Sequence, residues 1–450
     1  MITKANGSIK NPKIAPHFSE EAYKAMNRGK HSKVRRRPVW PAFVLAAVVI
    51  AAAAVLAVPQ LTADKAPEEA GPVSGQETPD AGAEPEPIPE PEPELAPEPD
   101  PEPEPDPAET LLARMDLRDK ICQMFIVFPS DLTGKFQMTS AGEGLEQALA
   151  EYPVGGILYD RSNMVSREQV RAMLDATQGY VEIPLILTCD EEGGRVNRLM
   201  DTVGTTWVGP MLDYKDAGVE TARENARTIA SDMVSCGFNM DLAPVADVWS
   251  NPANTVIGDR AYSDGFDQAA ELVAAAVEGF HDGGAACTLK HFPGHGDTSA
   301  DSHYGSVYVH KTLDELRQNE LAPFRAGIAA GADAVMMGHL IIDQVDELPA
   351  LLSYKVVTEL LRDELDFGGV VITDSLQMQA MTDHYGGGEI AVGAVRAGVD
   401  VLLCPQNLRE SVEALMGAVE AGEITEARIN ESVLRILHLK QNAGILAGAE

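Results

Sequence analysis

The stretch Val370-Val371-Ile372-Thr373-Asp374 (VVITD) shows the pattern that decides the fold: a short run of β-branched residues that ends in a carboxylate. Similar apolar runs recur along the chain, separated by helical stretches. Such an alternation indicates a parallel sheet that is buried on both faces. The candidate strands are Phe125–Phe128, Gly155–Tyr159, Pro184–Asp190, Asn239–Val248, Cys287–His291, Ala334–His339, Val370–Asp374 and Val399–Cys404. Eight β/α units predict an α/β protein with a (β/α)8, TIM-like barrel.

One pair of helices can be placed in advance. Thr312 and Glu315 form a capping box, which marks a helix start, and Leu316 supplies an apolar face. Pro323 interrupts this pattern, so Leu321–Ala330 is predicted to be a second helix with its own start.

Polar residues close several of the predicted strands. In a (β/α)8 barrel, chemistry is carried by residues at the carboxyl ends of the strands. A single polar residue there could mark no more than a strand-to-loop transition, but several on one rim favour a site. These residues are Asp190, Asp247, Lys290 with His291, His339 and Asp374.

Composition excludes some classes of function. The 450 residues carry a formal net charge of -34, which argues against nucleic acid as a partner because phosphate binding needs clustered lysine and arginine.

The chain has five cysteines, an odd number, and none of them form a CxxC pair, so they match neither a disulfide framework nor a local zinc motif. We expect buried free thiols.

The N-terminal region predicts a membrane anchor. Residues 1–37 are basic towards their end, and an unbroken apolar run from Pro41 to Val58 follows. Its length is close to the roughly 20 residues that cross a bilayer. The basic side should stay in the cytoplasm, which places the remainder outside. The alternative is a cleaved signal peptide with an unusually long basic region, for which Ala51–Ala57 offers small residues; the protein would then be secreted.

A proline-rich spacer separates this anchor from the globular part. Glu84–Pro107 is nearly an alternation of proline with glutamate or aspartate, which favours extended polyproline II over packed structure. The predicted organisation is a cytoplasmic tail (1–37), a single transmembrane anchor in the cell membrane (38–61), a disordered acidic linker (62–108) and an extracytoplasmic barrel (109–450).

The densest group of reactive side chains lies in Lys290–His303 (KHFPGHGDTSADSH). His291 and His295 have the four-residue spacing of helical zinc motifs, but the intervening Pro-Gly should break a helix, so we expect no metal site. Asp301 and His303 are separated by one residue, and a carboxylate can orient an imidazole for acid/base work. A solvated polar loop is an equally good interpretation of that spacing.

Three further segments supply candidate polar groups. Asp374 at a strand end is well placed as a fixed carboxylate that faces a pocket, although strand-end aspartates also cap helices. Asp190–Arg198 (DEEGGRVNR) combines carboxylates with arginines that could bind sugar hydroxyls. Arg260 lies on another loop that follows a strand.

Together these segments resemble glycoside hydrolase family 3, and within it the β-N-acetylglucosaminidase branch of single-barrel type. The resemblance covers about residues 115–440 and rests on KHFPGHGDTSADSH, DEEGGRVNR, Asp241–Val248 (DLAPVADV), Gly258–Tyr262 (GDRAY) and Ile372–Met378 (ITDSLQM). The Asp-Ser-His loop distinguishes this branch from the β-glucosidases, which place a glutamate in a later domain. No second domain is expected here.

The resemblance implies Asp374 as nucleophile, His303 as general acid/base and Asp301 as the partner of His303. It also implies sugar contacts from Asp190, Arg198, Arg260, Lys290 and His291, with no metal and no organic cofactor. The implied activity is a retaining exo-β-N-acetylglucosaminidase, a β-N-acetylhexosaminidase that acts on a carbohydrate containing N-acetylglucosamine. Its source could be a muropeptide, a chitin fragment or another glycan, and we expect a monomer.

Two other functions remain open. A histidine carries no negative charge when it acts as base, so it repels an anionic acceptor less than glutamate would, and an N-acetylglucosaminide phosphorylase is possible. The other is an anchored carbohydrate-binding protein without activity. Intact Asp374, Asp301 and His303 argue against this second alternative.

The predicted topology has a direct test. Protease added to intact cells, with any outer barrier removed, should release the globular domain by cutting within residues 62–108. Protection of the domain from that protease would contradict the orientation. Release of a shortened form without protease would identify a cleaved signal peptide.

Overall fold

The computed structural model describes residues 106–299 and 305–446. All of them belong to one compact unit, which begins at Pro97. The predicted tail and anchor lie outside the described residues, and so does the predicted linker up to residue 105. None of the described helices combines the length and apolarity that a bilayer-spanning helix needs.

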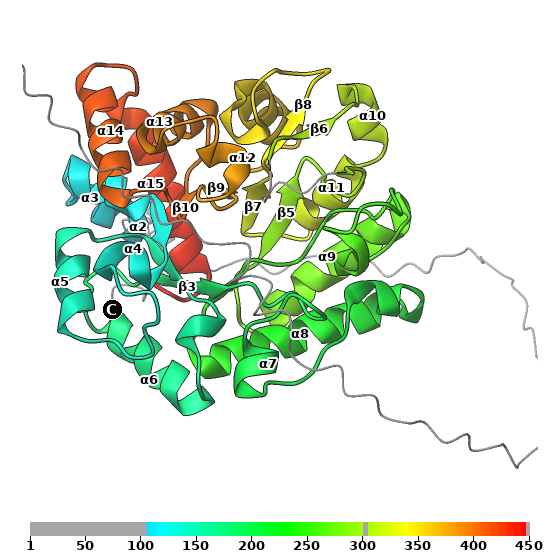
Figure 1. The fold of residues 1–450 in the computed structure, drawn as a ribbon, viewed down its shortest axis with the longest axis horizontal. Helices are drawn as coiled ribbons and strands as arrows, with labels where there is room; N and C mark the ends of the chain where they lie inside the picture. The colour runs from blue at the N-terminus through cyan, green and yellow to red at the C-terminus, as the bar shows by residue number, and fades with distance from the viewer. Residues whose placement is uncertain (1–105, 300–304, 447–450) are drawn as a thin grey trace, which may run out of the picture. The chain divides into compact units, whose positions relative to one another are not determined.

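Eight parallel strands form a barrel (Figure 1). They are β1 (Phe125–Val127), β2 (Gly156–Leu158), β3 (Ile186–Cys189), β4 (Met240–Asp241), β5 (Thr288–Phe292), β7 (Ala334–Met337), β9 (Val370–Thr373) and β10 (Leu402–Leu403). Regular hydrogen bonding joins them in the orders β10-β1-β2-β3-β4 and β5-β7-β9. Seven of the eight strands lie within the predicted apolar runs, and β5 extends one residue past its predicted end at His291.

The barrel closes at two seams, where neighbouring strands are joined by isolated bridges instead of a regular ladder. Isolated parallel bridges from Met240 to Ala286 and from Val245 to Lys290 connect β4 to β5, and one from Ile372 to Val401 connects β9 to β10. The regular part of β4 is shorter than the predicted run because Pro244 has no N–H to donate to a ladder. The predicted (β/α)8 barrel is confirmed.

A small two-stranded sheet was not predicted. It pairs β6 (Val307–Val309) in parallel with β8 (Leu340–Ile342). β6 is only three residues long, and its exposed Tyr308 interrupts the apolar pattern. β8 follows β7 so closely that the sequence shows one apolar run rather than two strands.

Helices surround the strands (Figure 1). The α-helices are α2 (Pro107–Leu112), α3 (Leu117–Gln123), α4 (Pro129–Thr133), α5 (Glu143–Glu151), α6 (Arg167–Gln178), α7 (Leu199–Val203), α8 (Val219–Cys236), α9 (Phe266–Asp282), α10 (Leu313–Gln318), α11 (Leu321–Ala329), α12 (Gln379–Thr382), α13 (Gly387–Ala397), α14 (Leu408–Glu420) and α15 (Glu426–Asn442). Shorter or wider turns are η1 (Arg161–Asn163), η2 (Met211–Ala217), η3 (Gly258–Arg260), η4 (Ala350–Leu352) and the π-helix η5 (Lys355–Glu364).

The two helices that were predicted in detail are confirmed. The Thr312 backbone N–H donates to Glu315 Oε2 over 2.8 Å, and the Glu315 N–H donates back to Thr312 Oγ1 over 3.3 Å. The next helix, α11, begins at Leu321, so Pro323 falls in its first turn, where no intrahelical N–H bond is required.

Asp400 reinforces the thin seam between β9 and β10. Its side chain is fully buried, and its Oδ2 accepts the Val371 N–H over 3.0 Å. Arg362 pairs with the same oxygen, while Arg435 Nη1 and Ser432 Oγ lie 3.1 Å and 2.7 Å from Oδ1. A side chain therefore adds contacts to the backbone hydrogen bonds of this seam, which form no regular ladder.

Lys440 on α15 is a buried lysine whose described hydrogen bond goes to an amide rather than to a carboxylate. Its Nζ donates to Gln123 Oε1 over 2.8 Å, and Gln123 is itself held by the carbonyl of Pro153. Burial lowers the pKa of the Lys440 ammonium from its ordinary value to about 7.

This lysine predicts a pH-dependent stability. The folded-state pKa lies below the unfolded value, so above pH 7 the unfolded chain binds more protons, and the free energy of unfolding should rise towards pH 10. We expect Lys440→Met to stabilise the fold by on the order of 2 kcal/mol near pH 6, with the difference from wild type shrinking towards pH 10. Urea unfolding across this range measures it, with the exposed Lys355→Met as control. A pH-independent difference would contradict the assignment.

Candidate active site

A cavity of about 560 Å³ opens at the carboxyl ends of the barrel strands. Six of the predicted site residues line it: Asp190, Arg198, Arg260, Lys290, His291 and Asp374. They come from the ends of β3, β5 and β9 and from η3, segments that are distant in the sequence. Of the predicted rim residues, Asp190, Lys290, His291 and Asp374 line this cavity, whereas Asp247 and His339 do not.

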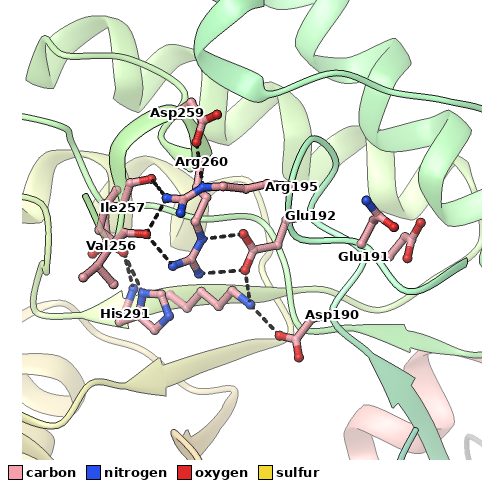
Figure 2. A network of polar contacts seen from close by, with 12 residues as sticks. Asp190, Glu191, Glu192, Arg195, Val256, Ile257, Asp259, Arg260 and His291 are labelled. Atoms are coloured by element: carbon pink, nitrogen blue, oxygen red, sulfur yellow. Dashed lines mark hydrogen bonds and ion pairs between the residues drawn. The ribbon is translucent and has the colours of Figure 1, made fainter. Parts of the chain in front are cut away.

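A buried network of ion pairs forms one wall of the cavity (Figure 2). Lys290 Nζ, on a side chain that is 2% exposed, lies 2.8 Å from Asp190 Oδ1 and 2.6 Å from Glu192 Oε1. Arg260 binds Glu192 through two parallel bonds, of 2.7 Å from Nε and 2.8 Å from Nη2. Arg198 Nη2 lies 3.2 Å from Asp190 Oδ2. Glu192 thus holds both Lys290 and Arg260 in place, while Asp190 remains partly open to the cavity.

The network fixes the charge of its members. Burial alone would raise the pKa of Glu192, but the charges of Arg260 and Lys290 outweigh it and hold that pKa well below its ordinary value. The pKa of Asp190 is lowered in the same way, against burial, by Lys290 and Arg198. Burial would lower the pKa of Lys290, but the two carboxylates raise it. At neutral pH all three groups are ionised, so Glu192 is unsuited to donate a proton.

Arg195 connects the two loops that carry this network. Its Nε lies 2.8 Å from Asp259 Oδ1, and its Nη2 donates to the carbonyls of Val256 and Ile257 over 2.7 Å and 3.0 Å (Figure 2). These contacts orient η3, where Arg260 lies. The sequence offered the arginines of Asp190–Arg198 as sugar-binding groups, but of the two only Arg198 lines the cavity, and Arg195 binds the neighbouring loop instead. An arginine in a loop carries no local signal of its partner.

Glu191 has a different task from its neighbours. It is buried, and its carboxylate accepts the backbone N–H groups of Arg198, Leu199 and Met200 at the start of α7. This fixes the backbone of Arg198 and thereby aims its guanidinium at Asp190. Of the two adjacent glutamates, Glu191 binds backbone N–H groups, whereas Glu192 forms ion pairs with Arg260 and Lys290.

Asp374 directly follows β9 and faces the cavity. Its backbone N–H donates to the Met337 carbonyl over 3.0 Å, and its Oδ1 accepts the Ser375 N–H over 2.7 Å. The next helix, α12, has Met378 at its N-cap, so Asp374 is not the cap of that helix. The alternative of a purely capping aspartate is therefore not supported.

Neighbouring groups keep Asp374 ionised. Burial alone would raise its pKa, but the charges of His339 and His291, the Ser375 N–H and Lys290 together lower it. His339 is fixed by a bond of 2.8 Å between its Nε2 and the Ser375 carbonyl oxygen. A carboxylate that is ionised, partly exposed and held at a strand end meets the requirements of a nucleophile.

Asp247 orients the two histidines of the cavity. Its fully buried carboxylate accepts from His291 Nδ1 over 2.7 Å and from the His295 backbone N–H over 2.6 Å. Nδ1 of His291 therefore carries a proton. His295 Nδ1 lies 2.7 Å from Thr298 Oγ1. The sequence placed Asp247 on the rim, but its pairing with His291 comes from the seam between β4 and β5.

His303 and Asp301, the predicted acid/base and its partner, lie outside the described residues. The described part of the same loop is anchored at Asp297, whose Oδ2 lies 3.1 Å from Lys311 Nζ. Lys311 also pairs with Glu320, and Asn254 Nδ2 donates to the His295 carbonyl over 2.7 Å. These contacts hold the described part of the loop, at His295 and Asp297, against neighbouring elements of the barrel.

The described residues form a (β/α)8 barrel with ionised side chains around a cavity at the carboxyl ends of its strands. Residues 116–439 match the model of the glycosyl hydrolase family 3 N-terminal domain. The chain belongs to glycosyl hydrolase family 3, and the predicted family is confirmed.

Similar proteins agree with this membership. Beta-hexosaminidase A of Pseudoalteromonas piscicida is 31% identical over 67% of this chain, and the match spans 56% of that protein. Beta-hexosaminidase of Stenotrophomonas maltophilia strain R551-3 is 38% identical over 59% of this chain and 80% of its own length. A solved family 3 β-N-acetylglucosaminidase from Paenibacillus sp. FPU-7 is 40% identical with a TM-score of 0.70, and the match covers 75% of this chain and 64% of that one.

Proposed function

We propose that this protein is a retaining exo-β-N-acetylglucosaminidase that cleaves terminal β-linked N-acetylglucosamine from a glycan. The observation that carries the proposal is Asp374: an ionised carboxylate at the end of β9, facing a cavity lined by sugar-binding types of side chain. The names of the similar proteins support the sugar specificity, because they include beta-hexosaminidases and a β-N-acetylglucosaminidase.

In the proposed mechanism, Asp374 attacks the anomeric carbon while His303, oriented by Asp301, protonates the leaving oxygen. Water then attacks the covalent intermediate, gives its proton to His303 and releases Asp374. Asp190, Arg198 and Lys290 present acceptors and donors to the hydroxyls of the terminal sugar, and His291 and Arg260 complete the wall of the cavity.

Charge balance in the cavity favours water over phosphate as the acceptor. The cations Arg198, Arg260 and Lys290 are already paired with Asp190 and Glu192, and Asp374 adds a further negative charge. Little positive charge is left to attract an anion. We therefore prefer hydrolysis to phosphorolysis.

The predicted anchor and linker favour a substrate outside the cytoplasm. We propose that the barrel stands on the outer side of the cell membrane and acts there on peptidoglycan fragments or related glycans. Product analysis on isolated peptidoglycan fragments, with and without phosphate, distinguishes hydrolysis from phosphorolysis and tests this substrate.

The nucleophile is tested by Asp374→Asn, which replaces a charged nucleophile with a neutral amide of equal size. We expect turnover of an aryl N-acetylglucosaminide to fall by on the order of 10⁴-fold while the melting temperature changes little. A fluorinated substrate that traps the glycosyl-enzyme should label the peptide containing Asp374. The exposed Asp383→Asn is the matched control and should keep full activity. Labelling of another carboxylate would refute the assignment.

The proton donor is tested by His303→Ala with leaving groups of different acidity. If His303 protonates the leaving oxygen, disaccharide cleavage should fall by about 10²- to 10⁴-fold, whereas substrates with acidic phenols should be affected far less, because a phenolate departs without a proton. Asp301→Ala should show the same pattern more weakly. An equal loss for all leaving groups would mean that His303 binds substrate or holds its loop instead.

A further inference from the structure

A second group of reactive side chains lies at the end of the barrel opposite the cavity. It consists of His281 on the last turn of α9, Cys287 just before β5, and Asp333 just before β7. His281 Nε2 lies 2.9 Å from Asp333 Oδ2 and 4.0 Å from Cys287 Sγ. The Cys287 backbone N–H donates to the same Asp333 oxygen over 2.9 Å.

The donor atoms lie close to the spacing that a small divalent cation requires. They lie within 4.8 Å of one another. Zinc is bound at about 2.0–2.1 Å by histidine nitrogen, about 2.0–2.2 Å by carboxylate oxygen and about 2.3 Å by thiolate sulfur, usually in a tetrahedron. These bond lengths place neighbouring donors roughly 3.3–3.6 Å apart. The observed spacings of 2.9 Å and 4.0 Å lie on either side of that range, so small side-chain rotations would suffice.

Accessibility and donor chemistry agree with this geometry. The His281 side chain is 38% exposed, which gives an ion a way in, whereas Cys287 is fully buried. Asp333 also lines a cavity of about 310 Å³, whose lining includes neither His281 nor Cys287. All five cysteines are free and buried, as predicted, but among them only Cys287 belongs to such a group in the described part of the chain.

We propose that His281, Cys287 and Asp333 form a binding site for a divalent cation of the zinc type, which links α9, β5 and β7 at the amino-terminal end of the barrel. On binding, the Cys287 thiol and His281 Nε2, which donates to Asp333 without the metal, release their protons to solvent. The thiolate, the freed nitrogen lone pair and the Asp333 carboxylate then bond to the metal. One sulfur, one imidazole and one carboxylate favour zinc over magnesium or calcium, which prefer oxygen ligands. We assign the site a structural role, because Cys287 and Asp333 precede their strands whereas Asp374 follows β9 at the opposite end of the barrel.

Cobalt(II) serves as the spectroscopic probe, since a thiolate-bound Co²⁺ absorbs through charge transfer from sulfur. Titration of the metal-free full chain with Co²⁺ should produce this band at one equivalent, and Zn²⁺ should abolish it by displacement. Zn²⁺ at a hundredfold excess over its dissociation constant should raise the melting temperature by on the order of 2 °C. Turnover of an aryl N-acetylglucosaminide should not change.

Three variants test which side chains hold the ion. Cys287→Ser should lose the charge-transfer band, and His281→Gln, at a partly exposed position that tolerates exchange, should lose the zinc-dependent rise in melting temperature. Cys236→Ser, which alters a buried cysteine outside the group, should keep both. Absence of the band in the folded wild type would overturn the proposal and leave a simple ion pair between His281 and Asp333. Metal binding that survives in Cys287→Ser and inhibits turnover would place the ion at the catalytic cavity, and would equally overturn it.

Discussion

The Lys290 ammonium, buried between the carboxylates of Asp190 and Glu192, is the interaction on which the site depends. A buried charge without partners costs several kcal/mol, so each ion of this network needs the others. Glu192 also binds Arg260 through both of its carboxylate oxygens, so its negative charge is shared between two cations. Because these residues come from β5, the loop after β3 and η3, the charge balance fixes the relative positions of three β/α units. The shape of the cavity follows from that constraint.

The same arrangement separates roles among chemically similar side chains. Three consecutive acidic residues follow β3, yet Asp190 faces the cavity, Glu191 holds backbone N–H groups and Glu192 is saturated by cations. Asp374 and Asp247 differ in the same way. Neighbouring groups lower the pKa of both carboxyls, but Asp247 is fully buried and orients His291, whereas Asp374 keeps access to the cavity. Exposure and the number of partners, rather than residue type, decide which carboxylate can react.

Closure of the barrel concentrates polar side chains at its two thin seams. Between β4 and β5, Asp247 and His291 bond across a region with isolated bridges only. Between β9 and β10, Asp400 and its arginines take the corresponding position. One seam lies beside the catalytic cavity and the other serves stability. Backbone hydrogen bonds cross both seams without forming a regular ladder, and buried carboxylates accept the backbone N–H groups of His291 and Val371 there.

The sequence by itself determined the barrel and most of the described site. Continuous apolar runs such as Val370–Thr373 mark buried parallel strands, because a strand buried on both faces needs an apolar residue at each consecutive position. Polar residues at the carboxyl ends of these runs, such as Asp374, mark the rim of the barrel. Only the tertiary structure decided the partners. Glu192 and Arg260 are 68 residues apart, and Cys287 and Asp333 are 46 apart, so no local spacing connects them. The physical reason is that periodicity records which face of an element is buried, whereas pairing depends on which side chains the closed barrel brings within bonding distance.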